Sequence, residues 1–233
     1  MRLAIMQPYF LPYIGYWQLM AAVDTFVVYD QIKYTKKGWI NRNRMLLNGD
    51  AAMFSLPLAK ASDELDVVQR ELADSFDRRK LLAQLVGAYR KAPEFEAVLP
   101  LLERVVLHST QNLFDYLWHS IREVAAHLGL ETRLVRSSSL DVDSALKAQD
   151  KVLALCAAAG AQHYVNAIGG FELYQREAFG AQGLELQFLR SNWPVYAQFG
   201  SFEHVPWLSI VDVLMFNPLP QVQAQLRTEF ELL

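Results

Sequence analysis

Short apolar runs alternate with stretches of helical periodicity at the start of the chain. Residues 2–6 (RLAIM) form a short, largely apolar run that is typical of a buried strand. Residues 25–30 (TFVVYD) are rich in β-branched and aromatic side chains, which predicts a second buried strand. Residues 9–22 between them are predicted to form a helix, and Pro12 is tolerated there only because it falls in the first turn. This succession predicts a strand–helix–strand unit, and such units build parallel sheets.

The same alternation returns in the second half of the chain. Strands are expected at 132–138, 162–167 and 184–189, and helices at 144–158 (with Ser144 as its N-cap), 171–180, 206–216 and 219–231. The middle is helical, with apolar residues at helical spacing in 77–91, 94–107 and 111–128. We therefore predict an α/β fold, a parallel-stranded Rossmann-like sheet with a helical insert at about 77–129, in one domain spanning 1–233.

A β-hairpin is predicted over residues 39–58, where two extended runs flank Asn48-Gly49. Side chains alternate between the two faces of a strand, so the asparagines of the first run share one face and its arginines share the other. These polar side chains are Asn41, Asn43, Arg42 and Arg44. The edge of such a hairpin is also a natural place for oligomer formation.

Composition narrows the class of protein and its location. The net charge of −3 argues against general nucleic-acid binding, which needs a basic surface. Cys156 is the single cysteine and lies in an apolar run, which favours a buried helical thiol and a reducing compartment. We find neither a signal-peptide pattern nor an apolar window of about 18 residues, so we expect a cytoplasmic protein without a membrane span.

Candidate chemistry gathers where predicted strands end, because ligands of open α/β sheets bind beyond the carboxyl ends of the strands. Gln7 and Tyr9 follow the first strand, and Gly15 and Tyr16 lie in the helix after it. Backbone amides at the start of that helix would suit an anion. The alternative is that the tyrosines are core residues and the prolines simply turn the chain.

The second strand ends at Asp30, and a basic segment follows it. Its cations are Lys33, Lys36, Lys37, Arg42 and Arg44, with no acidic residue among them. Such a patch suits a phosphorylated or carboxylated ligand, although a solvated loop with a lysine-guarded edge strand would look the same. A third strand end carries Gly169-Gly170, which allows backbone amides to approach a ligand but also makes ordinary turns.

Several familiar sites lack their motifs. The histidines are scattered without the spacing of metal ligands, so no metal site is predicted. The chain also lacks the glycine-rich phosphate loop, the dinucleotide-binding fingerprint and the nucleophile elbow of hydrolases.

Four idiosyncratic stretches resemble the WbqC-like family of bacterial proteins. They are QPYFLPYIGYWQLMAAVDTFVVYDQIKYTKKGWINRNRM, KAPEF, YVNAIGGFELY and NWPVYAQFGSFEHVPWLSIVDVLMFN. Members tend to be encoded among genes for O-antigen and other surface-polysaccharide (lipopolysaccharide) sugars. The resemblance implies O-antigen biosynthesis and the modification of an amino sugar while it is linked to its nucleotide.

The same resemblance selects a set of residues in this sequence. The matching positions are Gln7, Pro8, Pro12, Gly15, Tyr16, Asp24, Asp30, Trp39, Asn41, Arg42, Asn43, Gly169, Gly170, Tyr174, Pro194, Tyr196, Gln198, Ser209, Asp212 and Asn217. Pro218 departs from the family pattern, which commonly has a glycine there, so any role of the backbone at that point is in doubt.

A fainter resemblance links residues 2–30 to the first strand–helix–strand unit of adenylyl- and nucleotidyl-transferases of the HIGH-motif type. In those enzymes histidines bind the triphosphate. Residues 12–16 (PYIGY) occupy the equivalent stretch without a histidine. If the fold is shared, the phosphate chemistry is altered or absent, and the basic segment would have to supply the charge.

The first functional hypothesis is a transferase that moves a small acyl or aminoacyl group, such as glycyl, to the amino sugar of a nucleotide-linked sugar. Lys36, Lys37, Arg42 or Arg44 would hold the diphosphate, and Trp39 or Tyr16 would stack on the base or sugar. Asp30 or Asp212 would be the general base, and a salt bridge or helix cap is the alternative for either.

Two other hypotheses stay open. One is an ATP-dependent adenylyl or nucleotidyl transferase with a degenerate HIGH-type site, which would use ATP and magnesium. The other is a non-catalytic partner of a sugar-modifying enzyme. The sequence identifies neither the cofactor nor the sugar, nucleotide and donor group.

Overall fold

The computed structural model describes residues 1–192, 194–200 and 203–233, so three residues of the 192–217 stretch lie outside the described part. Its centre is a six-stranded sheet in the order β5-β2-β1-β6-β7-β8. The strands are β1 (Arg2–Met6), β2 (Thr25–Val28), β5 (Arg133–Arg136), β6 (His163–Ala167), β7 (Glu185–Ser191) and β8 (Phe230–Leu232). The first five of these pair in parallel and β8 runs antiparallel to β7. The predicted α/β class with a parallel sheet is confirmed.

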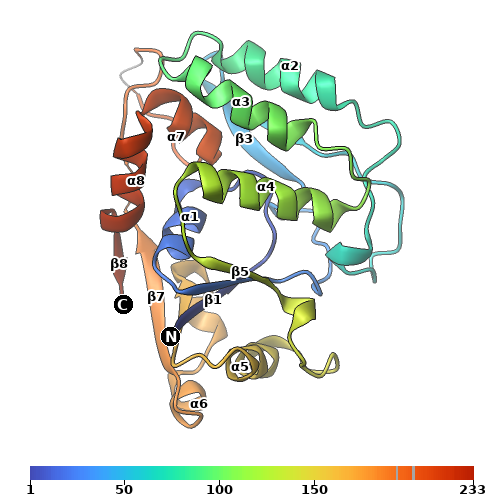
Figure 1. Ribbon diagram of the computed structural model, residues 1–233, viewed down its shortest axis with the longest axis vertical. Helices are drawn as coiled ribbons and strands as arrows, with labels where there is room; N and C mark the ends of the chain where they lie inside the picture. Colours follow the sequence, from blue (N-terminus) through green and yellow to red (C-terminus); the bar gives the residue numbers. More distant parts are fainter. Residues whose placement is uncertain (193, 201–202) are drawn as a thin grey trace.

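Helices cover both faces of this sheet (Figure 1). One face carries α1 (Ile14–Ala21), α4 (Leu113–His127) and α8 (Leu219–Thr228), and the other carries α5 (Ala148–Ala158) and α6 (Arg176–Gly180). Two separate hydrophobic clusters correspond to these faces. Side chains of β6 show the alternation, since Val165 packs in the first cluster and Tyr164 in the second.

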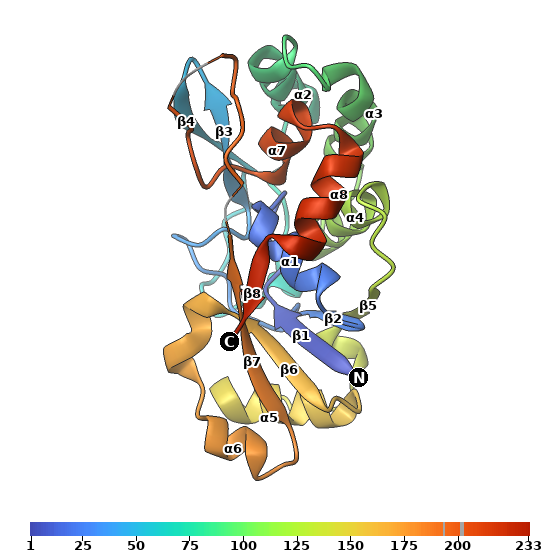
Figure 2. The ribbon, with the colours of Figure 1, turned by 90° about the vertical axis from the view of Figure 1, so that its left-hand side faces the viewer.

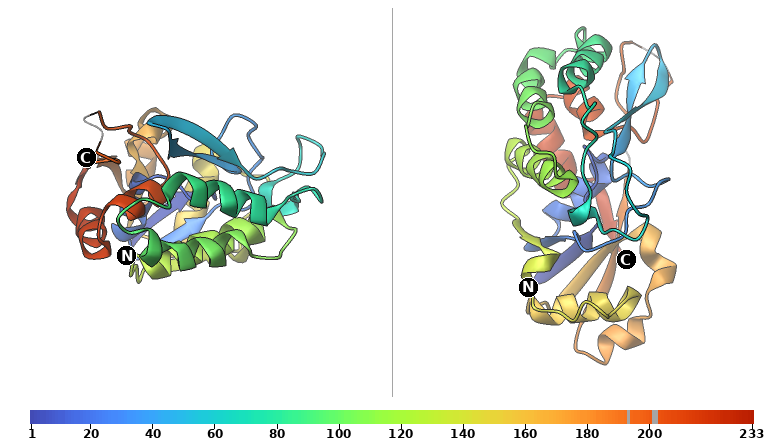
Figure 3. Two further views of the ribbon diagram at one scale, coloured as in Figure 1. Left: turned by 90° about the horizontal axis from the view of Figure 1, so that it is seen from above. Right: turned by 90° about the vertical axis from the view of Figure 1, so that its right-hand side faces the viewer.

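The connection from β2 to β5 carries the predicted hairpin and helical insert. It contains β3 (Arg42–Leu47), β4 (Asp50–Ser55), the 3-10 turn η1 (Val67–Gln69), α2 (Arg78–Tyr89) and α3 (Phe95–Val106), and it ends in α4. The hairpin stands beside α2 and α7 (Ile210–Phe216), away from the sheet (Figures 2 and 3). Since α4 packs on the sheet, it is the crossover helix between two parallel strands as well as the last helix of the insert.

Several expected boundaries are wrong, including the start of the helix predicted at 206–216, which begins at Ile210, and the helix predicted at 171–180, which is a 3-10 segment followed by the short α6. The first helix begins at Ile14 and not at residue 9, because Leu11 takes a left-handed backbone conformation (φ 45°) that a helix does not allow. Ser144 is not a helix cap, since α5 begins four residues later with Lys147 as its N-cap. The last predicted helix ends at Thr228, and the chain then adds β8 to the sheet.

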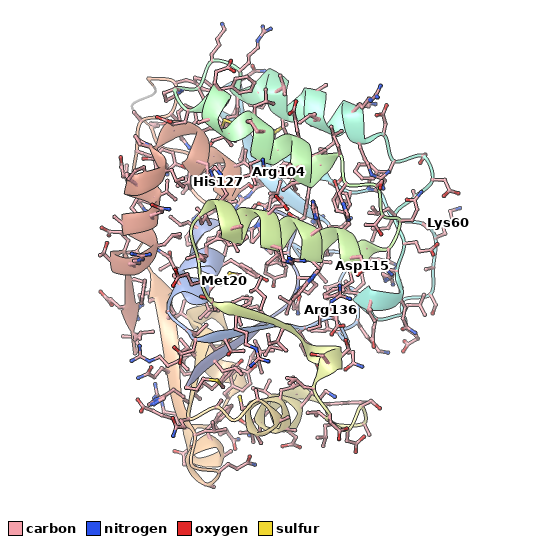
Figure 4. All side chains as sticks on the ribbon, in the orientation of Figure 1. Met20, Lys60, Arg104, Asp115, His127 and Arg136 are labelled. Carbon is pink, nitrogen blue, oxygen red and sulfur yellow. The ribbon has the colours of Figure 1, made fainter. Side chains whose placement is uncertain are left out.

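The carboxyl end of β5 is fixed to α4 by a cation. The guanidinium of Arg136 lies 3.2 Å from the carboxylate of Asp115 and over the rings of Phe114 and Trp118, at 5.2 and 5.1 Å from their centres. Figure 4 labels both charged residues at this junction. The contact joins the crossover helix to the strand that follows it.

Among the described helices, none is long and apolar enough to cross a membrane.

We expect the protein to lose stability as the pH falls below about 6.5, the ordinary pKa of histidine. The ring of His108 stacks on His119 with centroids 3.9 Å apart. Burial and the neighbouring His119 lower the pKa of His108, and burial together with Arg104 lowers the pKa of His127. The folded state therefore binds these protons less readily than the unfolded state, so acidification favours unfolding.

Thermal unfolding between pH 5 and 8 measures this effect. The unfolding temperature should rise with pH through the acidic half of the range, and His108→Gln and His127→Gln should each flatten that rise. All other titratable groups are the same in the parent protein and in both variants, so differences between the slopes isolate the histidines. Identical profiles for both variants and the parent protein would contradict the assignment.

Candidate active-site cleft

A cleft of about 1060 Å³ opens where the connections of the sheet change sides. The strands β1 and β6 are neighbours, yet the chain leaves β1 toward α1 on one face and leaves β6 toward α6 on the other. Ligands of open α/β proteins bind at such a switch point, beyond the carboxyl ends of the strands. We refer to this cavity as the switch-point cleft.

The lining of the cleft is aromatic and polar. It draws on the end of β1, on residues 29–39 and 64–66, on the start of α5, and on the chain after β6. The aromatic residues are Tyr9, Tyr13, Tyr29, Trp39, Tyr164 and Tyr174. Flat rings suit the stacking of a base or the face of a sugar, and tyrosine hydroxyls add hydrogen-bonding groups.

The loop between β1 and α1 brings Gln7, Tyr9 and Tyr13 into the cleft. The amide of Asn43 on the hairpin donates to the carbonyls of Phe10 and Leu11, at 3.1 and 2.8 Å. A second donor to Leu11 is the hydroxyl of Ser209, the N-cap of α7, at 2.7 Å. Asn43 and Ser209 both donate to the carbonyl of Leu11, and these bonds stabilise its strained left-handed conformation. The ring of Tyr13, which follows this turn, is thereby held in position.

Gly15 and Tyr16 support this loop from beneath. A side-chain carbon on Gly15 would lie 2.4 Å from the ring of Tyr13, so the glycine makes room for that ring and not for a ligand. Tyr16 is fully buried in the core, and its hydroxyl donates to the carbonyl of Gln7 at 3.2 Å. Burial, followed by the nearby Tyr9, raises the pKa of Tyr16.

Charged side chains stand on two walls of the cleft. On one wall Lys33 pairs with Glu64, and Asp66 lies beside them without an ion pair among the described residues. On the other wall Lys147 and Lys151 come from the start of α5. A ligand that spans the cleft therefore meets a carboxylate at one side and ammonium groups at the other.

Comparison with known proteins places most of the chain in one family. The WbqC-like protein family matches residues 7–224. The chain belongs to this family. Its similarity to the uncharacterized protein Rv1507c of Mycobacterium tuberculosis (strain ATCC 25618 / H37Rv) is 28% identity over 222 residues, which covers 93% of each chain. No solved structure matches the chain.

Several residues predicted to bind substrate line the cleft of this WbqC-like protein. They are Gln7, Tyr9, Trp39, Gly169 and Gly170. The glycines belong to the 3-10 segment η3 (Ile168–Leu173) after β6. A side-chain carbon on Gly170 would lie 2.2 Å from the amide nitrogen of Asn166, so this glycine accommodates an asparagine that also lines the cleft.

The basic segment mostly faces away from the cleft. Lys36 pairs with Asp63 at 2.9 Å and Lys37 is exposed, and neither lines the cavity. The guanidinium of Arg42 donates to the carbonyl of Gly38 at 2.9 Å. That of Arg44 lies over the ring of Trp39, 5.3 Å from its centre.

Asn41, the neighbour of this basic segment on the hairpin, has a structural set of partners. It accepts from the hydroxyl of Tyr34 at 2.9 Å and donates to the carbonyl of Leu56 at 2.7 Å. These contacts join the segment to Leu56, which follows β4 at the open end of the hairpin. The predicted role of Asn41 in ligand binding stays a prediction, as do those of Lys36, Lys37 and Arg42.

Asp30 lies at the end of β2 with no exposed surface and does not line the cleft. Its carboxylate accepts from the hydroxyls of Ser137 and Ser138, both at 2.5 Å, and from the backbone amide of Ser138 at 2.9 Å. These serines form the 3-10 turn η2 (Ser137–Ser139) after β5. The carboxylate thus joins two neighbouring strand ends, and its role as a base stays a prediction.

Asp212 is the centre of a second buried network, at α7. Its carboxylate accepts from the hydroxyl of Tyr196 at 2.6 Å, the amide of Gln198 at 2.7 Å and the hydroxyl of Tyr89 at 2.9 Å. Tyr89 in turn accepts from the backbone amide of Leu46 at 2.9 Å. Burial raises the pKa of Asp212, and these donors oppose the shift. The network ties α7 to α2, to the hairpin and to residues 196–198.

Several residues of the cleft were not anticipated from the sequence, among them Asp66, Lys151 and Asn166. Asp66 is the N-cap of η1 and forms a capping box with Gln69, a common structural motif. Lys151 and Asn166 lie in segments that look like an ordinary helix and strand. The available signal for Lys151 was its position in the first turn of a helix that follows a strand.

Among the described residues, no group of His, Cys, Asp and Glu is arranged to hold a metal ion.

Proposed function

We propose that this WbqC-like protein is a transferase of surface-polysaccharide biosynthesis. Its reaction would move a small acyl or aminoacyl group to the amino group of a nucleotide-linked amino sugar, with the switch-point cleft as the active site. The observation that carries the proposal is the cleft itself, which has a volume of about 1060 Å³ and an aromatic and polar lining. One wall offers the carboxylate of Asp66 and the other offers the ammonium groups of Lys147 and Lys151. A nucleotide sugar has the matching parts, namely a flat base, a diphosphate and a sugar.

In the proposed reaction, the sugar ammonium first loses a proton to a carboxylate. Its nitrogen then forms a bond to the carbonyl carbon of an activated acyl donor, a thioester or ester, and the donor's sulfur or oxygen leaves with a proton. Asp66 is the base in this proposal, because it lines the cleft and has no ion-pair partner among the described residues. Asp30 and Asp212 have no exposed surface and lie outside the cleft lining.

A thermal-shift panel tests the ligand class. The compounds are UDP-, GDP-, dTDP- and CMP-linked sugars, each with and without an amino group, and nucleoside triphosphates with magnesium. A ligand at about a hundredfold its dissociation constant adds about 2.7 kcal/mol, which corresponds to a rise of about 5–10 °C for a chain of this size. We expect one class of nucleotide-linked amino sugar to give this rise.

The other outcomes contradict the proposal in different ways. Stabilisation by ATP with magnesium alone would favour the adenylyl-transfer hypothesis, whose turnover consumes ATP and releases pyrophosphate. Stabilisation by a nucleotide sugar without turnover of any acyl donor would favour a binding protein. No shift across the panel would remove the support for the cleft as a nucleotide-sugar site.

Asp66→Asn separates binding from chemistry. The amide keeps the shape of the side chain and cannot accept a proton at neutral pH, so we expect nucleotide-sugar binding within about twofold of the parent and turnover reduced by about 10²–10⁴-fold. Asp63→Asn is the matched control, since Asp63 lies in the same loop, pairs with Lys36 and does not line the cleft. Equal turnover in Asp66→Asn and the parent protein would exclude Asp66 as the base.

A further inference from the structure

The wall formed by the start of α5 contains a buried cation without a counter-ion. Lys151 is only 3% exposed, and its ammonium donates to the backbone carbonyls of Asp143 at 2.9 Å and Val142 at 3.5 Å. It pairs with no carboxylate within the described ranges of the chain. Burying an ammonium group is costly unless a negative charge compensates it, and Lys151 lines the switch-point cleft.

Backbone amides at the same wall also lack acceptors. The helix α5 is 11 residues long and begins after Lys147, whose side chain also borders the cleft. The amides of Ala148 and Gln149 donate to no acceptor in the part of the chain that the structure describes. The first amides of a helix carry partial positive charge and point outward, an arrangement that favours anions.

A third donor faces the cleft from the sheet. Asn166, the penultimate residue of β6, is 7% exposed, and its side-chain amide has no hydrogen-bond partner among the described residues. It lines the same cavity as the start of α5, and the missing side chain of Gly170 gives it room. The amide atoms of Asn166 are not sealed from solvent, so they remain free to bond a ligand group in the cleft.

We propose that Lys151, Asn166 and the first amides of α5 form a phosphoryl-binding subsite that holds the diphosphate of the ligand. Lys147 adds a second cation at its rim. This inference rests on the proposed function and adds the orientation of the substrate. The diphosphate lies at the start of α5, and the sugar extends toward Asp66. It also moves the phosphate contacts from the basic segment, where Lys36 already has a carboxylate partner, to the opposite wall.

Inorganic pyrophosphate is the probe that tests the subsite apart from any sugar. Binding is measured by titration calorimetry at low ionic strength for the parent protein and for Lys151→Met, Asn166→Asp and Lys60→Met. Methionine keeps the length of the lysine side chain without its charge, and aspartate keeps the shape of asparagine but repels an anion. Lys60 is the control, because it is exposed on a loop (Figure 4) and is not among the residues that line the cleft.

We expect the parent protein and Lys60→Met to bind pyrophosphate equally, and Lys151→Met and Asn166→Asp to bind it about tenfold to a hundredfold more weakly. Acetate at the same concentration should bind weakly to all four proteins, since a carboxylate fills only part of the subsite. No binding by the parent protein, or equal binding by all four, would overturn the inference. Circular dichroism confirms that each variant is folded, and either cleft variant alone suffices for the test.

Titration with the nucleotide sugar from the thermal-shift panel separates the two proposals. If that ligand binds Lys151→Met and Asn166→Asp as tightly as the parent protein, the proposed function stands and the subsite is wrong. If pyrophosphate binding depends on both residues but no nucleotide-linked amino sugar is bound or modified, the subsite stands and the proposed function fails.

Discussion

Replacing Asp212 by alanine is expected to lower the free energy of unfolding by about 3–5 kcal/mol, because it leaves buried donors without an acceptor. Those donors are the hydroxyls of Tyr89 and Tyr196 and the amide of Gln198, and each lies within 2.9 Å of the carboxylate. An unsatisfied buried donor costs about 1–3 kcal/mol. The loss is therefore larger than that of most surface substitutions.

Urea unfolding of the variant measures this loss, with Asp74→Ala as the control. Asp74 is exposed and makes no hydrogen bond or ion pair with a described residue, so its replacement should change stability by less than about 0.5 kcal/mol. A destabilisation of Asp212→Ala below about 1 kcal/mol would show that the network is not what holds α7 to the hairpin.

The same substitution bears on whether Asp212 acts in chemistry. A residue that only maintains the fold affects turnover in proportion to the fraction of unfolded protein, so activity should recover at temperatures well below the unfolding transition. Asp212→Asn offers a second comparison, because it keeps one oxygen acceptor and removes the charge. A folded Asp212→Asn variant with no turnover would return Asp212 to the list of catalytic candidates.

Local sequence pattern was sufficient for the scaffold of this protein. Alternating apolar strands and amphipathic helices predicted the parallel sheet, and Asn48-Gly49 predicted the hairpin, because these signals involve residues close together in the chain. The start of the first helix was misplaced for a different reason. The left-handed turn at Leu11 depends on donors from Asn43 and Ser209, which lie far away in the sequence.

The partners of polar side chains were much harder to predict. Asp30 looked like a candidate base at a strand end, but the serines that surround it are 107 and 108 positions away along the chain. Lys36 looked like a phosphate ligand, but its ammonium group forms an ion pair with the carboxylate of Asp63. A sequence shows that a charge follows a strand, whereas long-range packing decides whether that charge meets a partner or a cavity.

The cleft itself was predicted at its β1 edge and missed at its α5 edge. The proline- and tyrosine-rich turn after β1 stood out because its composition is unusual for a strand-to-helix turn. Lys151 and Asn166 did not, since a lysine in a helix and an asparagine near a strand end are common. The burial of Lys151 without a carboxylate partner, and of Asn166 without a hydrogen-bond partner, among the described residues becomes visible only when β1, β6 and α5 are placed side by side.

Asn43→Ala is expected to lower the free energy of unfolding by about 2–4 kcal/mol and to loosen the loop between β1 and α1. The substitution removes the donors to the carbonyls of Phe10 and Leu11 and the acceptor for the backbone amide of Arg44. Asn43 is buried, so water cannot replace these bonds fully. Without them, the left-handed conformation at Leu11 loses one of its two side-chain anchors.

Asn41→Ala is the matched control for this effect. Asn41 also makes two hydrogen bonds from the hairpin region, to Tyr34 and Leu56, and neither reaches the loop. Urea unfolding should show a loss of about 1–2 kcal/mol for Asn41→Ala. Hydrogen–deuterium exchange should accelerate over residues 7–13 in Asn43→Ala only.

The comparison of these two asparagines decides what the hairpin contributes to the site. Faster exchange confined to the loop, together with weaker binding of the cleft ligand, would mean that Asn43 acts by positioning Gln7, Tyr9 and Tyr13. Unchanged exchange in Asn43→Ala would instead mean that Ser209 suffices to hold the turn. In that case any loss of ligand binding would have to come from a direct contact, as the sequence first suggested, and the proposed site would extend from the cleft to the hairpin.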